Sequence, residues 1–295
     1  MRGKRLLAVS VAVLLIVAFA AALFIKESGK GGEGSGIMVV VTIPPQAEFV
    51  KRVGGEKVAV ITMVPQWANP HTYEPTPAQL MNVSKAKMYV KMGSGIEFEI
   101  AWMDKIKSIN ENMLIVDCSN GIELLKEDGK ADPHIWLSPK NAKIIVENIC
   151  EGLVQIDPAN STYYEQNKEA YLRELDALDK EISQILSKTS KTSAHKFIVY
   201  HPAWSYFARD YGLEQISVEE GGKEPTPERI ASIIEEAKRN NITKIFASPQ
   251  FKDKAEVIAK EIGGKVVEIN PLAENYIENM RKFAEELAEE GENEQ

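Results

Sequence analysis

One long helical segment divides this chain of 295 residues into two halves with the same local pattern. Between residues 159 and 188, apolar side chains recur at steps of three and four positions, and no Gly or Pro interrupts them. This spacing predicts a single amphipathic helix of about 45 Å, at 1.5 Å per residue. The alternative is an ordinary core helix, but its length and its position between two sets of four strands favour a rigid connection, which permits less hinge bending than a pair of flexible strands. The recurring apolar residues are Tyr171, Leu175, Leu178, Ile182, Ile185 and Leu186.

On each side of this helix, short apolar runs alternate with amphipathic segments. Such alternation predicts an α/β fold with two lobes, each a four-stranded parallel sheet with flanking helices, joined by the one long rigid helix. The expected strands are residues 37–42, 58–63, 88–92 and 113–117, then 196–200, 215–218, 244–247 and 265–269. Helices are expected at 46–53, 77–85, 96–110 and 139–154, and again between the later strands.

A short internal repeat supports two lobes of the same design. The tetrapeptide Glu-Pro-Thr-Pro occurs at residues 74–77 and again at 224–227. Each copy offers Thr as an N-cap and Pro as the first helical residue, and each is followed by a helix and then a strand. Four residues alone are weak evidence, but their matching place in the strand and helix order gives them weight.

The N-terminus predicts a membrane-directed segment. Lys4 and Arg5 precede residues 6–25, of which only Ser10 is not apolar, and this length suffices to span a bilayer as a helix. We expect an uncleaved signal anchor that places the rest of the protein outside the cytoplasm, with a cleaved signal peptide as the alternative. The predicted domains are 1–28 (signal anchor or signal peptide), 29–36 (Gly-rich flexible tether), 37–158 (N-terminal lobe), 159–190 (connecting helix) and 191–295 (C-terminal lobe).

Composition excludes some classes of function. A hydrophobic fraction of 44% supports real cores, while the formal charge of −8 and the lack of a basic stripe argue against nucleic-acid binding. Cys118 and Cys150 are the only cysteines, too few for a zinc ribbon or a disulfide framework. We expect both to be buried, with a single disulfide as the open alternative. We expect the protein to act as a monomer.

Three of the four histidines sit in proline-marked loops that open helices. They are His71 in Asn-Pro-His-Thr-Tyr, His134 in Asp-Pro-His-Ile-Trp and His201 in Tyr-His-Pro-Ala-Trp. Because they belong to separate strand and helix units, they can meet only where the fold gathers several loops. Three such imidazoles predict a transition-metal site, and imidazole nitrogen suits zinc. His195 lies in a polar run before an expected strand and is interpreted as an ordinary polar residue.

The order of these motifs resembles a known family. The segments NPHTYEPTP, DPHIWLSPKNAK, YHPAWSYFARDYGL, IFASPQF and INPLAENY, with the long helix after the second, resemble the metal-binding solute-binding proteins of ABC importers, of the ZnuA and TroA type. The likeness runs from about residue 37 to about residue 286. It implies two lobes joined by a long helix, with one Zn(II) or Mn(II) ion held between them for delivery to a membrane permease.

The resemblance also implies a ligand set. His71 and His134 would come from the first lobe and His201 from the second, while the usual acidic fourth ligand falls on Asn270. This departure leaves the fourth position open to the Asn270 oxygen, a water molecule, or a carboxylate such as Glu74 or Glu219. Residues 126–132 offer no His-rich loop of the kind found in zinc-specific members.

Three nitrogen donors without a certain carboxylate favour Zn(II) over Mn(II) or iron, because Mn(II) prefers oxygen donors. Trp67, Trp136 and Trp204 lie near the candidate ligands and would form an apolar shell. We expect no enzymatic activity. The remote alternatives are an extracytoplasmic zinc hydrolase, for which no His-Glu-x-x-His helix is present, and a metal-stabilised adhesin.

Overall fold

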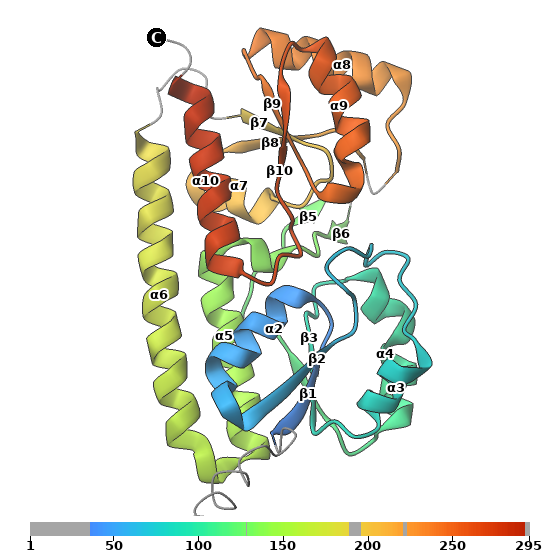
Figure 1. Ribbon diagram of the computed structural model, residues 1–295, viewed down its shortest axis with the longest axis vertical. Helices are drawn as coiled ribbons and strands as arrows, with labels where there is room; N and C mark the ends of the chain where they lie inside the picture. Colours follow the sequence, from blue (N-terminus) through green and yellow to red (C-terminus); the bar gives the residue numbers. More distant parts are fainter. Residues whose placement is uncertain (1–35, 128, 189–195, 221–222, 293–295) are drawn as a thin grey trace, which may run out of the picture. The chain divides into compact units, whose positions relative to one another are not determined.

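The first half of the chain folds around a parallel sheet with strand order β2-β1-β3-β4. The computed structural model describes residues 36–127, 129–188, 196–220 and 223–292. Helices α2 and α5 cover one face of this sheet and α3 and α4 the other (Figure 1). The bounds are β1 Ile37–Val41, β2 Val58–Thr62, β3 Met88–Lys91 and β4 Leu114–Asp117, with α2 Pro44–Gly54, α3 Pro77–Val83, α4 Glu97–Ile109 and α5 Pro139–Ile156.

The second half repeats this plan with strand order β10-β9-β7-β8, again parallel throughout. All eight predicted strands of the two sheets are present, each within one residue of its expected ends, so the predicted pair of four-stranded parallel sheets is confirmed. The strands are β7 Lys196–Val199, β8 Glu214–Ser217, β9 Lys244–Ala247 and β10 Lys265–Glu268, and the helices are α7 Ser205–Tyr211, α8 Pro227–Arg239, α9 Lys252–Glu261 and α10 Tyr276–Glu292.

Helix starts follow the proline and threonine signals read from the sequence. Thr76 caps α3 and Thr226 caps α8, in each case through its side-chain oxygen, and each helix has Pro at its first position. Ser138 caps α5 in the same way. The repeated tetrapeptide is therefore a helix-start device used at equivalent places in the two lobes.

The predicted long helix is α6, Ser161–Ser187, of 27 residues. It runs beside α5, α2 and α10 (Figure 1). However, α6 is not the only element that joins the lobes. A single cluster of buried apolar side chains begins at β1, includes Phe197 and Val199 of β7, and ends on α10 with Phe283 and Leu287. The two sheets therefore share a core, which restrains their relative motion more than one helix would.

A hairpin between the sheets was not predicted. Strand β5, Lys126–Glu127, pairs with β6, Lys130–Ala131, in antiparallel fashion just before the His134 loop. Two residues per strand are too few to show a period of two in the sequence. Figure 1 shows this hairpin at the level where the two lobes meet.

Two sequence expectations concern cysteines and the membrane. Cys118 and Cys150 are both buried and free, so a disulfide between them is excluded. Within the described residues, no helix is both long and apolar enough to cross a membrane. The predicted signal anchor at residues 1–28 and most of the tether at 29–36 lie outside the described residues.

Gly152 sets the distance between α5 and the first sheet. A Cβ atom at this position would lie 2.4 Å from Cγ2 of Val116 and 2.9 Å from Sδ of Met88. Only a glycine therefore lets the helix backbone approach the sheet so closely. Since α5 follows the His134 loop directly, this close approach also fixes the distance of that loop from the first sheet.

We expect Gly152→Ala to lower the free energy of unfolding by about 1–3 kcal/mol through overpacking. The higher helix propensity of alanine would by itself raise the free energy of unfolding by about 1 kcal/mol. A decrease therefore indicates overpacking, and an increase indicates that helix propensity dominates. Urea unfolding followed by circular dichroism measures it. Glu151→Ala, on the exposed side of the same helix, is the matched control and should change stability little. A Gly152→Ala protein as stable as wild type would contradict the close approach.

Candidate metal centre

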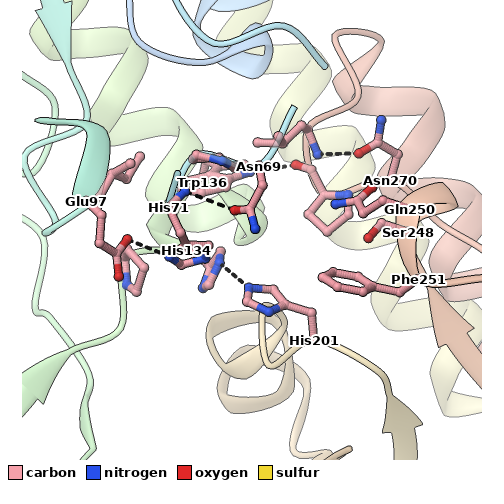
Figure 2. A pocket seen from close by; sticks show the side chains of 15 residues that line it. Asn69, His71, Glu97, His134, Trp136, His201, Ser248, Gln250, Phe251 and Asn270 are labelled. Atoms are coloured by element: carbon pink, nitrogen blue, oxygen red, sulfur yellow. Dashed lines mark hydrogen bonds and ion pairs between the residues drawn. The ribbon is translucent and has the colours of Figure 1, made fainter. Parts of the chain in front are cut away.

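The candidate ligands meet at the carboxyl ends of the parallel strands. His71 lies in the loop after β2, His134 lies before α5, and His201 lies two residues after the end of β7. In open α/β sheets this is the edge where ligands bind, because the loops there converge. One pocket is lined by all three histidines together with Glu97, Trp136, Ser248, Gln250, Phe251 and Asn270 (Figure 2).

The imidazoles of His134 and His201 face each other across the lobe boundary. Their Nε2 atoms are 3.3 Å apart, and their ring centroids are separated by 5.2 Å. Two nitrogens bound to zinc at about 2.0–2.1 Å with a tetrahedral angle are about 3.3 Å apart. This pair therefore already has the spacing that one shared zinc ion requires. The third ring, that of His71, has its centroid 5.4 Å from that of His201.

Each of the three imidazoles is held by a carboxylate at its other nitrogen. The Nδ1 atom of His71 lies 2.7 Å from Oε2 of Glu97, that of His134 lies 2.8 Å from Oδ1 of Asp132, and that of His201 lies 2.8 Å from Oε2 of Glu219. An ionised carboxylate accepts a hydrogen bond from a protonated Nδ1, which leaves the lone pair of a neutral imidazole on Nε2. The three carboxylates therefore select the tautomer in which Nε2 is free to bind a metal.

None of these three carboxylates was assigned this orienting role from the sequence. Asp132 lies two residues before His134 and stood inside the quoted motif, so its proximity was a usable signal. Glu97 comes from the start of α4 and Glu219 lies two residues after the end of β8, and only the fold brings them to the histidines. Glu219 had been considered as a possible fourth ligand, but its Oε2 is engaged by His201.

Burial and charge tune the protonation of these groups. Burial lowers the pKa of His201, and its bond to Glu219 only partly opposes this effect. Burial tends to raise the pKa of Asp132, but the bonds that it accepts from His134 and Ser205 outweigh burial and lower it. The bond from His71 lowers the pKa of Glu97. Near neutral pH the pocket thus combines carboxylates that stay ionised with at least one imidazole that stays neutral, which favours a divalent cation.

The predicted fourth residue, Asn270, lines the same pocket on the side of the second lobe. Its Oδ1 accepts the N–H of Leu272 at 2.9 Å, and its Nδ2 donates to the carbonyl of Gln66 at 3.4 Å. The amide oxygen is therefore shared with its own turn. Glu74, another suggested donor, is exposed and does not line this pocket.

The pocket suits an ion rather than an organic solute. Its volume of about 40 Å³ holds an ion and at most a few water molecules. Within residues 36–127, 129–188, 196–220 and 223–292, no group of three or more His, Cys, Asp or Glu side chains is already arranged to hold a metal. His134 and His201 are correctly spaced, so a third donor requires a change in side-chain position.

The expected tryptophan shell is only partly present. Trp136 lines the pocket, is buried, and donates from Nε1 to the carbonyl of Pro271 at 2.8 Å. Trp67 is 77% exposed, so its assignment to an apolar shell was wrong. Trp204 is buried against Phe283 in the shared core instead. The apolar side of the pocket is completed by Phe251, whose ring stacks on His201 at 6.0 Å.

Two lobes of parallel sheet with converging imidazoles between them define a two-lobed α/β binding protein with a pocket of ionic size. The family model for the periplasmic zinc-uptake complex component A, ZnuA, matches residues 39–290, and the chain belongs to this family.

Relatives agree with this assignment. The chain is 32% identical to the high-affinity zinc uptake system protein ZnuA of Bacillus subtilis over 84% of this chain and 83% of that protein. It is 31% identical to the manganese ABC transporter substrate-binding lipoprotein scaA of Streptococcus gordonii, over 82% of each chain. A crystal structure of a ZnuA deletion mutant with zinc bound matches with a TM-score of 0.82 and 42% identity, over 87% of this chain and 98% of that one.

We expect His201 in the metal-free protein to titrate below the ordinary histidine value of about 6.5, because burial disfavours its charged form. As pH falls through 6.5, the unfolded chain takes up a proton that the folded protein refuses, so stability should fall over that interval. Nitrogen-detected NMR of the imidazoles measures the titration, and it should report Nδ1–H with a bare Nε2. A midpoint at or above 6.5 would contradict this environment.

Proposed function

We propose that this protein captures Zn(II) between its two lobes outside the cytoplasm and delivers it to an ABC-type permease for import. The ligands would be the Nε2 atoms of His71, His134 and His201. The observation that carries this proposal is the His134–His201 pair, whose Nε2 separation of 3.3 Å fits one tetrahedral zinc ion. Family membership supports the same function.

The donor set favours zinc over manganese. Three imidazoles face the pocket. Each of the carboxylates, those of Glu97, Asp132 and Glu219, uses one oxygen to accept a hydrogen bond from an Nδ1 atom. Manganese and iron prefer more oxygen donors than this arrangement presents. Manganese is the second candidate, supported by the 31% identity to a manganese transporter component.

We expect His71→Ala, His134→Ala and His201→Ala each to lower zinc affinity by at least about 100-fold, because each variant removes one of three strong donors. Competition with a zinc chelator measures the affinities in a protein that begins at residue 37. His195→Ala is the matched control, since the sequence predicts no role for that histidine. If any of the three variants keeps wild-type affinity, that residue is not a ligand.

We propose Asn270 for the fourth position, with a water molecule as the alternative. Its Oδ1 accepts one N–H, from Leu272, and the second lone pair of a carbonyl oxygen remains for an ion. A neutral amide is a weaker donor than the acidic residue that the resemblance implies here. This difference would lower affinity for Mn(II) more than for Zn(II).

Accordingly, Asn270→Asp should tighten the binding of both metals and narrow the gap between them, because an anionic oxygen helps Mn(II) more. Aspartate can still accept from Leu272, so the turn should survive. Competitive titrations with Zn(II) and Mn(II) on both proteins provide the measurement. Unchanged affinities would place Asn270 outside the coordination sphere and leave water as the fourth donor.

The remaining features fit a carrier rather than an enzyme. No general base is proposed, because the pocket carboxylates serve as imidazole partners. We propose the domain limits 37–158, 159–190 and 191–295 for the two lobes and their connecting helix. Residues 1–28 would direct export and either anchor the protein or be removed. We propose that the protein works as a monomer, with the permease and the metal ion as its partners and no nucleic acid.

A further inference from the structure

The His134 loop follows the first sheet in sequence but is fastened to the second lobe. Indole Nε1 of Trp136 donates to the carbonyl of Pro271, after β10. The hydroxyl of Tyr206, on α7, donates to the carbonyl of Asp132 at 3.0 Å. The hydroxyl of Ser138 donates to the carboxylate of Asp210, also on α7. Three hydrogen bonds to the second lobe thus hold the seven residues 132–138.

The hydroxyl of Tyr206 is the hydrogen-bond partner of two backbone groups. Its oxygen also accepts the N–H of Leu125 at 3.0 Å, so one buried hydroxyl bridges both sides of the base of the β5–β6 hairpin. Asp132 is the residue whose side chain orients His134. Loss of this hydroxyl would leave two backbone groups without that partner and would release the segment that carries the orienting carboxylate.

Asp210 holds the other end of the same segment. Its side chain is only 4% exposed and also accepts from Arg209. Ser138, which donates to it, is the N-cap of α5, so this contact joins the start of α5 to the end of α7. Helix α7 begins four residues after His201. One short helix therefore connects the His201 loop with both ends of the His134 loop.

The His71 loop lacks comparable ties. Within the described residues, it is joined to the second lobe by a long hydrogen bond, from Nδ2 of Asn270 to the carbonyl of Gln66 at 3.4 Å. The side chain of His71 is 28% exposed, against 10% for His134 and 15% for His201. Trp67, in the same loop, is largely exposed. The three candidate ligands therefore differ in how closely their loops are tied to the second lobe and in how exposed their side chains are.

We propose that α7 sets the spacing between His134 and His201, with Tyr206 and Asp210 as positioning residues that determine metal affinity without touching the metal. The His134–His201 pair is a preformed half of the site, and His71 completes it after the ion has entered. This inference rests on the proposed function, because it assigns a cause to the affinity of that same site.

Tyr206→Phe tests the proposal because it removes one oxygen and keeps the buried ring. We expect zinc affinity to fall about tenfold, the low end of the range for groups that support metal ligands, mainly through faster release. Stopped-flow transfer of zinc to a chelator gives the release rate. Tyr211→Phe is the matched control: it lies on the same helix and loses a hydroxyl bond of 2.8 Å to Asp179 of α6, away from the His134 loop.

A purely structural role for Tyr206 would lower the melting temperatures of both variants alike and leave zinc affinity equal in the two. That result overturns the proposal. A double-mutant cycle adds a second criterion: Tyr206→Phe and Asp132→Asn should be non-additive in zinc affinity, whereas Tyr211→Phe and Asp132→Asn should be additive. Additivity in both cycles also overturns it.

Asp210→Ala provides an independent route should Tyr206→Phe fold poorly. We expect it to weaken zinc binding about fivefold or more, and wild-type affinity in this variant would contradict the role of α7. Failure of the proposed function is recognised separately. In that case the wild-type protein itself would not bind zinc, or His134→Ala would bind it as tightly as wild type.

Discussion

The position of every pocket residue depends on the apolar core that the two lobes share. Side chains of β1, α2, α5 and α6 continue without a break into those of β7, α7 and α10. Aromatic contacts reinforce the junction, as between Phe49 of α2 and Tyr276 of α10, with ring centroids at 5.0 Å. Separating the lobes would expose this apolar surface to water, at a free-energy cost of about 25 cal/mol per Å². Loops from separate units can therefore place the side chains of His134 and His201 opposite each other, with their Nε2 atoms 3.3 Å apart.

Buried polar groups at the same junction are satisfied across it. Glu48 of α2 accepts from the hydroxyl of Tyr171 on α6 and from the backbone N–H of Tyr276 on α10. Burial raises the pKa of Glu48, against the effect of these bonds. A carboxylate that joins three helices would lose its partners if the lobes moved apart, and an unpaired buried acceptor is costly. Core and polar contacts thus oppose a wide hinge opening.

The sequence predicted the fold well because its signals are local. Proline, threonine and serine at helix starts, together with apolar runs of four to six residues, were enough to place all eight sheet strands. The three histidines were identified from their loop context, and the structure brings them to one pocket. The partners of those histidines were harder to predict, because Glu97 begins α4 and Glu219 follows β8, and only tertiary structure joins them to the histidines. The assignment of Trp67 to the apolar shell was wrong for a related reason, because nearness in sequence to His71 does not determine the direction in which a loop side chain points.

A carrier must both bind its ion tightly and give it up, and the shared core restricts how it does so. The shared core holds the sheets together, and in our proposal α7 holds the His134–His201 pair. Releasing a metal by a large lobe motion would therefore cost much free energy. The His71 loop, which has fewer ties to the second lobe, offers a smaller change, since moving it would remove one of the three proposed donors and open the pocket to water. With the proposed ligand set, loss of one nitrogen donor would lower the metal affinity while the core stays intact. The same division would explain capture: a fixed pair with the correct spacing lowers the entropy cost of binding, and the third imidazole would then complete the proposed site.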